Sequence, residues 1–145
     1  MKAVIQRVIE AQVSVEGEVV GRIGPGLVVL IGVAKDDTAE DADHLGDRIL
    51  AFRIFDDAAG KMNHSVREIG GQLLVISQFT LVAVVVKGRR PNFESVAGKE
   101  TAERLYHRFI DRLTAGGLTV ETGRFGAQMI VSIHNDGPVT FILES

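Results

Sequence analysis

The sequence predicts an α+β fold, because it contains several strands and two helices that are too few and too scattered for regular β-α alternation. Three patterns support this. Residues 2–15 alternate between apolar and polar side chains, Leu73–Ile76 is an unbroken apolar run typical of a strand buried on both faces, and apolar residues recur at helical spacing in two separate segments. The 145 residues fit one domain, residues 1–145, with one sizeable core.

The first part of the chain is expected to form a hairpin followed by a central strand. Arg7 falls in the apolar phase of residues 2–15, and an inward arginine must be paired or must point into a pocket. A turn at residues 16–18, a strand from Val19, a tight turn at residues 24–26 and a strand at residues 27–33 should follow. The other members of the apolar phase are Ala3, Ile5, Ile9, Ala11, Val13 and Val15.

Two helices are expected. Thr38 with Asp41 predicts the start of the first, and the second should cover about residues 94–115, ended by Gly116-Gly117. Residues 53–55 look extended, and Asp56-Asp57 is interpreted as a solvated turn and not as a metal site. After the second helix, the pattern predicts strands at residues 118–120, 129–133 and 139–143, with a turn at residues 135–138.

The composition excludes several classes of function. The chain has no cysteine, so disulfides, thiolate metal sites and thiol catalysis are absent. Its four histidines lie far apart without ligand-like spacing, and no metal or cofactor site is expected. The net charge of −3 argues against a protein that coats nucleic acid, although it is compatible with a local basic patch. Without an apolar signal core or a run long enough to span a bilayer, a cytoplasmic protein without membrane contact is expected.

Polar side chains cluster at the end of the buried strand, where Ser77, Gln78 and Thr80 follow Ile76. Core strands seldom place three hydrogen-bonding side chains together unless something outside uses them. Each alone could simply satisfy neighbouring backbone groups, and composition does not decide between these readings. No Ser-His-Asp order, Gly-x-Ser-x-Gly elbow or close carboxylate pair is visible. An enzyme of this sequence would therefore catalyse an undemanding reaction, or its substrate would supply a catalytic group.

Two motifs favour the enzyme. Ser77-Gln78-Phe79-Thr80-Leu81 together with Asn135-Asp136-Gly137-Pro138-Val139-Thr140 resembles the two signature motifs of the D-aminoacyl-tRNA deacylases, also called D-tyrosyl-tRNA deacylases. Either motif alone would be weak, whereas both, in this order and in a chain of this length, are specific. The likeness runs along the whole chain, because other segments match by position and order: Gln6-Arg7-Val8, residues 24–27, residues 61–63, residues 87–91 and residues 125–129.

The resemblance implies an obligate homodimer whose active sites lie at the subunit interface, built from mostly antiparallel β-sheets packed in layers with two main helices (β/β/α). It implies hydrolysis of the ester that joins a D-amino acid, or glycine, to the 3′-terminal adenosine of tRNA. The Gly137-Pro138 peptide would be cis and would enter the partner's pocket. Its carbonyl oxygens, held against the substrate's α-carbon, would leave room for hydrogen on one side only and so reject L-aminoacyl-tRNA.

The resemblance also implies roles for the first motif, Ser77, Gln78, Phe79 and Thr80, as the catalytic segment. Backbone N–H groups near Gln78, Phe79 and Thr80 would donate to the oxyanion. Thr80 is the only candidate nucleophile, but no base is evident beside it. We therefore expect Thr80 to position groups while the neighbouring ribose hydroxyl of the RNA assists the attacking water.

Three further residues, Arg7, Met129 and Asn135, are expected to support the site, with Arg7 donating to backbone carbonyls of the Gly137-Pro138 segment. The cations Lys87, Arg89 and Arg90 are expected to contact tRNA phosphates.

One segment departs from the family pattern. Val84-Val85-Val86 stands where the family usually has an acid, a threonine and a basic residue, so the pocket rim or the tRNA contacts are expected to be altered. Two other functions stay open. One is a non-catalytic, dimeric tRNA-binding module that holds phosphates without cleaving an ester. The other is a structural dimer whose polar strand end serves only the interface.

Overall fold

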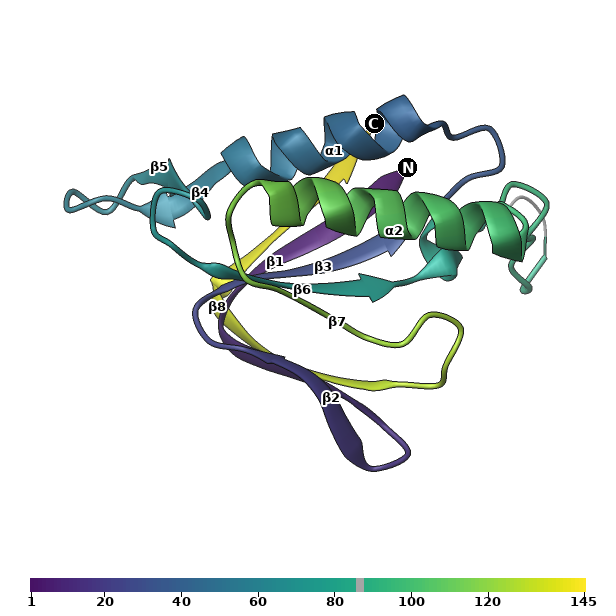
Figure 1. Cartoon of the computed structure of the whole chain (residues 1–145), viewed down its shortest axis with the longest axis horizontal. Helices are drawn as coiled ribbons and strands as arrows, with labels where there is room; N and C mark the ends of the chain where they lie inside the picture. The colour runs from purple at the N-terminus through teal and green to yellow at the C-terminus, as the bar shows by residue number, and fades with distance from the viewer. Residues whose placement is uncertain (86–87) are drawn as a thin grey trace.

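The computed structural model describes residues 1–85 and 88–145, which form eight strands, two α-helices and one short 3₁₀ helix. Both α-helices lie over one face of a strongly curved sheet (Figure 1). This arrangement confirms the α+β class. In chain order the elements are β1 (Lys2–Val15), β2 (Glu18–Ile23), β3 (Gly26–Gly32), α1 (Ala39–Ala51), β4 (Arg53–Asp56), β5 (Met62–Ser65), β6 (Gln72–Ser77), η1 (Phe79–Val82), α2 (Lys99–Ala115), β7 (Val120–Thr122) and β8 (Ile130–Glu144).

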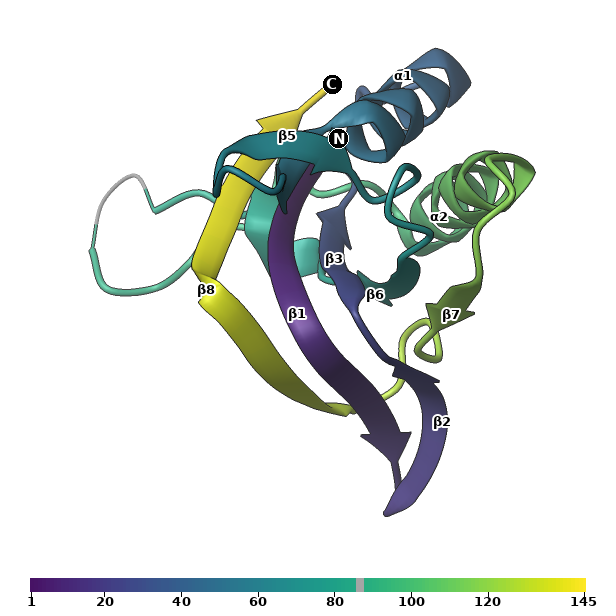
Figure 2. The ribbon, with the colours of Figure 1, turned by 90° about the vertical axis from the view of Figure 1, so that its left-hand side faces the viewer.

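The main sheet is mixed, with the order β2-β1-β3-β6-β7 and with β8 on the other side of β1. All three partners of β1 are antiparallel to it, whereas β3, β6 and β7 pair in parallel. The strands β2 and β3 lie end to end along β1, which curls the sheet in its middle (Figure 2). A Cβ on Gly21 of β2 would lie 2.8 Å from the carbonyl oxygen of Thr122 in β7. This close approach makes the sheet a nearly closed barrel.

Two cores explain the unbroken apolar run of β6. Leu73 and Val75 belong to the larger core between the sheet and the helices, while Leu74 and Ile76 belong to a smaller core inside the curled sheet. All four side chains are buried, so both faces of β6 are covered, as the sequence predicts. The protein therefore has a sheet-on-sheet core next to a sheet-on-helix core, in agreement with layered packing.

The two helices run parallel to each other, because ion pairs join Asp43 to Arg108 and Asp47 to Arg112 in the same order along both. The hydrogen bonds from these arginines hold the pKa of each aspartate below its usual value. The predicted start of α1 is confirmed. The Thr38 hydroxyl accepts from the Asp41 N–H, and the Asp41 carboxylate accepts from the Thr38 N–H, which is a complete capping box.

Several boundaries differ from those expected. The helix α2 begins at Lys99 and not near residue 94, because the preceding segment is tied to the end of β3: the Ala97 N–H donates to the Val33 carbonyl and Lys35 N–H to Ser95. The strand β7 starts at Val120 instead of residue 118. The strand β5 was not predicted, and among the described residues its four residues pair only with β4.

The hairpin between β1 and β2 is confirmed, with the turn residues Glu16 and Gly17 both at positive φ, as a two-residue turn requires. For one residue of β1, Ile9, the predicted inward position is wrong. Ile9 is 56% exposed and Val8 is buried in its place, because the alternation of β1 shifts by one residue where the register with β8 changes.

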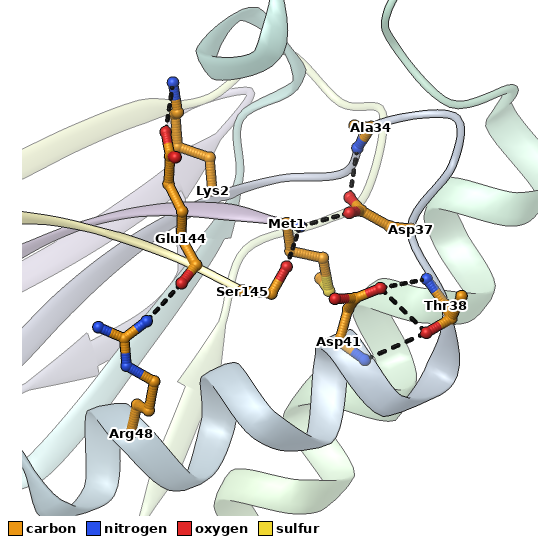
Figure 3. Close-up of polar contacts among 9 residues, drawn as sticks. All are labelled: Met1, Lys2, Ala34, Asp37, Thr38, Asp41, Arg48, Glu144 and Ser145. Atoms are coloured by element: carbon orange, nitrogen blue, oxygen red, sulfur yellow. Dashed lines mark hydrogen bonds and ion pairs between the residues drawn. The ribbon is translucent and has the colours of Figure 1, made fainter.

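The two ends of the chain meet beside α1 (Figure 3). The Met1 amino group donates to Asp37 at 2.5 Å and to the Ser145 hydroxyl at 2.6 Å. Glu144 pairs with Lys2 through its side chain, while its carbonyl accepts from Arg48 of α1. These contacts fasten the first and last strands to the helical layer. Among the described residues, no helix has the length and apolar character needed to cross a membrane.

Candidate active site

A cleft of about 530 Å³ opens at the carboxyl end of β6. The end of β6, the start of α2 and the loop between β7 and β8 lie at the same end of the molecule (Figure 1). Four of the predicted site residues line this cleft: Ser77, Gln78, Phe79 and Met129. Its other walls are mostly apolar and include Phe125 and Val131.

Free backbone donors occur where β6 gives way to η1. The Gln78 N–H donates to the Ile31 carbonyl of β3 at 2.8 Å, so this donor is already occupied. The N–H groups of Phe79 and Thr80 have no backbone acceptor within the described chain, as is usual for the first turn of a helix. The donors left for a ligand are therefore those of Phe79 and Thr80 and not that of Gln78.

The side chains of this segment bond to each other. The Gln78 amide Nε2 donates to the Thr80 Oγ1 at 2.5 Å, which leaves the threonine proton free to be donated elsewhere. Among the described residues, no histidine or carboxylate hydrogen-bonds to Thr80. The Phe79 ring is half-exposed and packs against Phe93 with 5.4 Å between ring centroids.

The second predicted motif forms a bulge in β8 and not the expected turn. Gln6 of β1 faces Thr140 and Val8 faces Asn135, so two steps along β1 match five along β8, and three residues are extra. The chain keeps its direction because the Asn135 side chain replaces the missing strand pairing. Its Oδ1 accepts from the Val139 N–H at 2.7 Å, and its Nδ2 donates to the Val139 carbonyl at 3.3 Å. Asn-Asp-Gly-Pro is ordinary turn chemistry, and only this side-chain bridge makes it a bulge.

Gly137 and Pro138 lie exposed on this bulge, and the peptide between them is cis, as the resemblance implies. Gly137 has a φ of 133°, a conformation that favours glycine. An added Cβ would lie 2.6 Å from Val139 Cγ2 and 3.4 Å from Arg7 Nη2. A side chain at position 137 would therefore strain the bulge.

Arg7 is the buried support of the bulge, with 8% of its surface exposed. Its Nε donates to the Asp136 carbonyl at 3.1 Å, and its Nη1 donates to the Ile54 carbonyl at 2.9 Å. The Asp56 and Asp136 carboxylates each lie 3.4 Å from the guanidinium. The predicted inward arginine is thus paired, and Asp56, expected to be only part of a solvated turn, is one of its partners.

Comparison with known proteins identifies the family. Residues 4–144 match the model of the family described as D-Tyr-tRNA(Tyr) deacylase. This chain belongs to that family of hydrolases. The resemblance inferred from its two motifs is confirmed.

Relatives named "D-aminoacyl-tRNA deacylase" match this family member from end to end. One from Syntrophotalea carbinolica is 57% identical and one from Symbiobacterium thermophilum 53%, each over 100% of this chain and over 97% and 96% of the relative. The solved structure of a "c-Myc DNA Unwinding Element Binding Protein" superposes with a TM-score of 0.94 at 43% identity, covering 100% of this chain and 99% of the other. That of a "probable eukaryotic D-amino acid tRNA deacylase" has a TM-score of 0.86 at 22% identity over 99% and 98% of the two chains, and it shows the shared fold alone.

Within this chain of the deacylase family, the predicted site residues form two separate groups. Ser77, Gln78, Phe79 and Met129 lie at the cleft, whereas the bend of β8 that carries the second motif lies at the opposite end of the molecule, beside β4 (Figure 1). Arg7 and Asn135 belong to the second group.

The basic loop lies near the cleft. Arg89 and Arg90 are exposed on a loop closed by the bridge between Val84 and Asn92, next to Phe93 and its contact with Phe79. Lys87 and Val86 lie outside the described residues. Val84 and Val85 are exposed, so the departure from the family pattern places apolar surface beside the cleft. Sequence reasoning did not assign most of the apolar wall of the cleft, and it missed the charged residue of that wall, Lys99, whose helix was expected to start five residues earlier.

Proposed function

We propose that this protein hydrolyses the ester bond of D-aminoacyl-tRNA and releases the free D-amino acid and tRNA. The observation that carries the proposal is the pair of free N–H groups of Phe79 and Thr80 beside the apolar cleft, in a chain of the deacylase family. An ester carbonyl seated there would receive both donors as negative charge develops on its oxygen. The cleft, with aromatic and aliphatic walls, suits the terminal adenosine that carries the ester.

The attacking group is water and not Thr80. No base contacts the threonine hydroxyl in the described structure, and this hydroxyl accepts a hydrogen bond from Gln78. Its remaining proton can be donated to the substrate or to the water, which makes Thr80 a positioning group. The neighbouring ribose hydroxyl of the RNA assists the water, and this is sufficient because an aminoacyl ester is already activated.

Chiral selection comes from Gly137-Pro138. Neither residue has a side-chain donor, and proline lacks an N–H, so this segment offers carbonyl acceptors to a neighbour. Arg7 and Asn135 hold the segment rigid from behind. Rigid carbonyls against the α-carbon admit hydrogen on one side and exclude an L side chain, so glycine mischarged on a non-cognate tRNA also passes.

The cleft receives Gly137-Pro138 from a second copy of the chain, in a homodimer. Within one protomer the bulge and the cleft lie at opposite ends, which supports a site completed across subunits (Figure 1). Among the described strands, β8 pairs only with β1, so its other edge is open. Its Ile130 and Ile142 side chains are 71% and 65% exposed. A long apolar edge strand is usually covered, and a second copy would cover it.

The test compares hydrolysis of matched D- and L-aminoacyl-tRNA by the purified protein. The D form should react at least about a hundredfold faster, which corresponds to on the order of 3 kcal/mol in transition-state discrimination. Equal rates would overturn the chiral mechanism. Binding of tRNA without hydrolysis of either form would support the non-catalytic module.

The cross-subunit arrangement is tested by mixing two variants. A Gly137→Ala subunit and a Thr80→Ala subunit should form a heterodimer in which one site carries both lesions and the other carries neither. Activity should then rise above that of either parent. If heterodimers form and activity does not rise, the site is not shared between subunits.

A further inference from the structure

The cleft contains one charged side chain, that of Lys99, among the described residues that line it. The other residues of its walls are apolar or uncharged, including Ser77, Gln78 and the aromatic rings of Phe79 and Phe125. Lys99 is the first residue of α2, so its backbone is held by the helix while its side chain is exposed to solvent. It makes no ion pair within the described part of the chain. The cleft therefore has one unpaired positive charge in its wall.

A single ammonium beside an apolar cleft selects an anion. The aminoacylated end of tRNA carries an α-ammonium next to its ester, which Lys99 would repel, and a phosphodiester on the 5′ side of the terminal adenosine, which Lys99 would attract. Arg89 and Arg90 do not line the cleft. Because they lie outside its wall, their cations are suited to phosphates farther along the strand.

We propose that Lys99 binds the last phosphodiester of the tRNA, between the terminal adenosine and the nucleotide before it, and so fixes the register of the ester in the cleft. This proposal rests on the proposed function. Lys99 is a positioning residue in it, because it touches the phosphate and not the reacting ester. Lys99 would hold the phosphate at one wall of the cleft, and the apolar side chains would hold the adenine base. With both groups held, the ester is placed beside the N–H groups of Phe79 and Thr80.

The experiment compares Lys99→Ala with Arg67→Ala, a control that removes an exposed cation in the turn before β6, at the other end of that strand from the cleft. Two substrates separate the roles: a D-aminoacyl-tRNA, which has the phosphodiester, and a D-aminoacyl-adenosine, which has no phosphate. For the tRNA substrate, Lys99→Ala should raise KM by about tenfold, the effect of losing one hydrogen bond to a charged group, with kcat within about twofold. For the adenosine substrate neither variant should change KM, and Lys99→Arg should restore the tRNA value.

The salt dependence gives a second measure that a packing role would not change. The log–log slope of tRNA binding should fall by about 0.7 in Lys99→Ala, as expected for one phosphate contact on a single strand, and should not change in Arg67→Ala. An equal loss on both substrates, or an unchanged slope, would overturn the proposal. If the wild-type protein binds tRNA but hydrolyses neither substrate, the proposed function fails, and the binding slope still decides the role of Lys99.

Discussion

Replacing Arg7 by methionine tests the support of the bulge, because methionine retains the apolar stem and removes the guanidinium. Two hydrogen bonds from a charged donor to buried or half-buried carbonyls, those of Ile54 and Asp136, are lost. Bonds of this kind contribute about 1.5 kcal/mol each at the lower end, so the free energy of unfolding should fall by about 3 kcal/mol. For a chain of 145 residues this corresponds to a fall in Tm of about 6–12 °C.

The control for this variant is Arg22→Met. Arg22 is exposed on the neighbouring strand β2 and, among the described residues, its side chain hydrogen-bonds only to the half-buried Gln12 side chain. Its loss should be below about 0.5 kcal/mol. Urea unfolding at constant m measures both values. The reasoning is refuted if the two variants lose the same stability. If the proposed function is also correct, Arg7→Met should lower the ratio of D to L hydrolysis, while Arg22→Met leaves it unchanged.

Three other predictions follow from the contacts. Asn135→Ala removes the acceptor of the Val139 N–H, so the free energy of unfolding, measured with urea, should fall by about 2 kcal/mol. A loss below about 0.5 kcal/mol would contradict the bridging role of the Asn135 side chain. Burial raises the pKa of Tyr106 to about 12, and this is the one tyrosine of the chain, so its ultraviolet titration should have a midpoint near 12 in the folded protein and near 10 in urea. Because the folded state retains the proton more tightly, this stabilisation is complete below about pH 10 and is lost as the pH rises to about 12. Replacing Arg89 and Arg90 by alanine should reduce the log–log salt slope of tRNA binding by about 1.4, if each arginine contacts one phosphate, and should preserve the D/L preference. An unchanged slope would show that this loop does not contact the tRNA.

The elements that local sequence alone could determine were the ones predicted most closely. The alternation of β1, the two-residue turn at Glu16-Gly17 and the capping box at Thr38 depend on residues no more than a few positions apart. The unbroken apolar run of β6 also predicted correctly that the strand is buried, because a strand covered on both faces needs apolar side chains at odd and even positions alike. The two signature motifs identified the family for the same reason, since each is a contiguous segment.

The tertiary structure decided what depends on distant partners. The inward position of Arg7 was predictable, but its partners Ile54 and Asp136 lie 47 and 129 residues away, and no local pattern names them. The segment from Asn135 to Pro138 has the composition of a turn, and it became a bulge because β1 continues alongside it and the Asn135 side chain closes the gap. Lys99 entered the cleft wall because residues before it pair with the end of β3 and so fix where α2 begins. Hydrophobic periodicity and helix capping depend on residues of a single helix or strand, whereas these three outcomes depend on which helices and strands pack together.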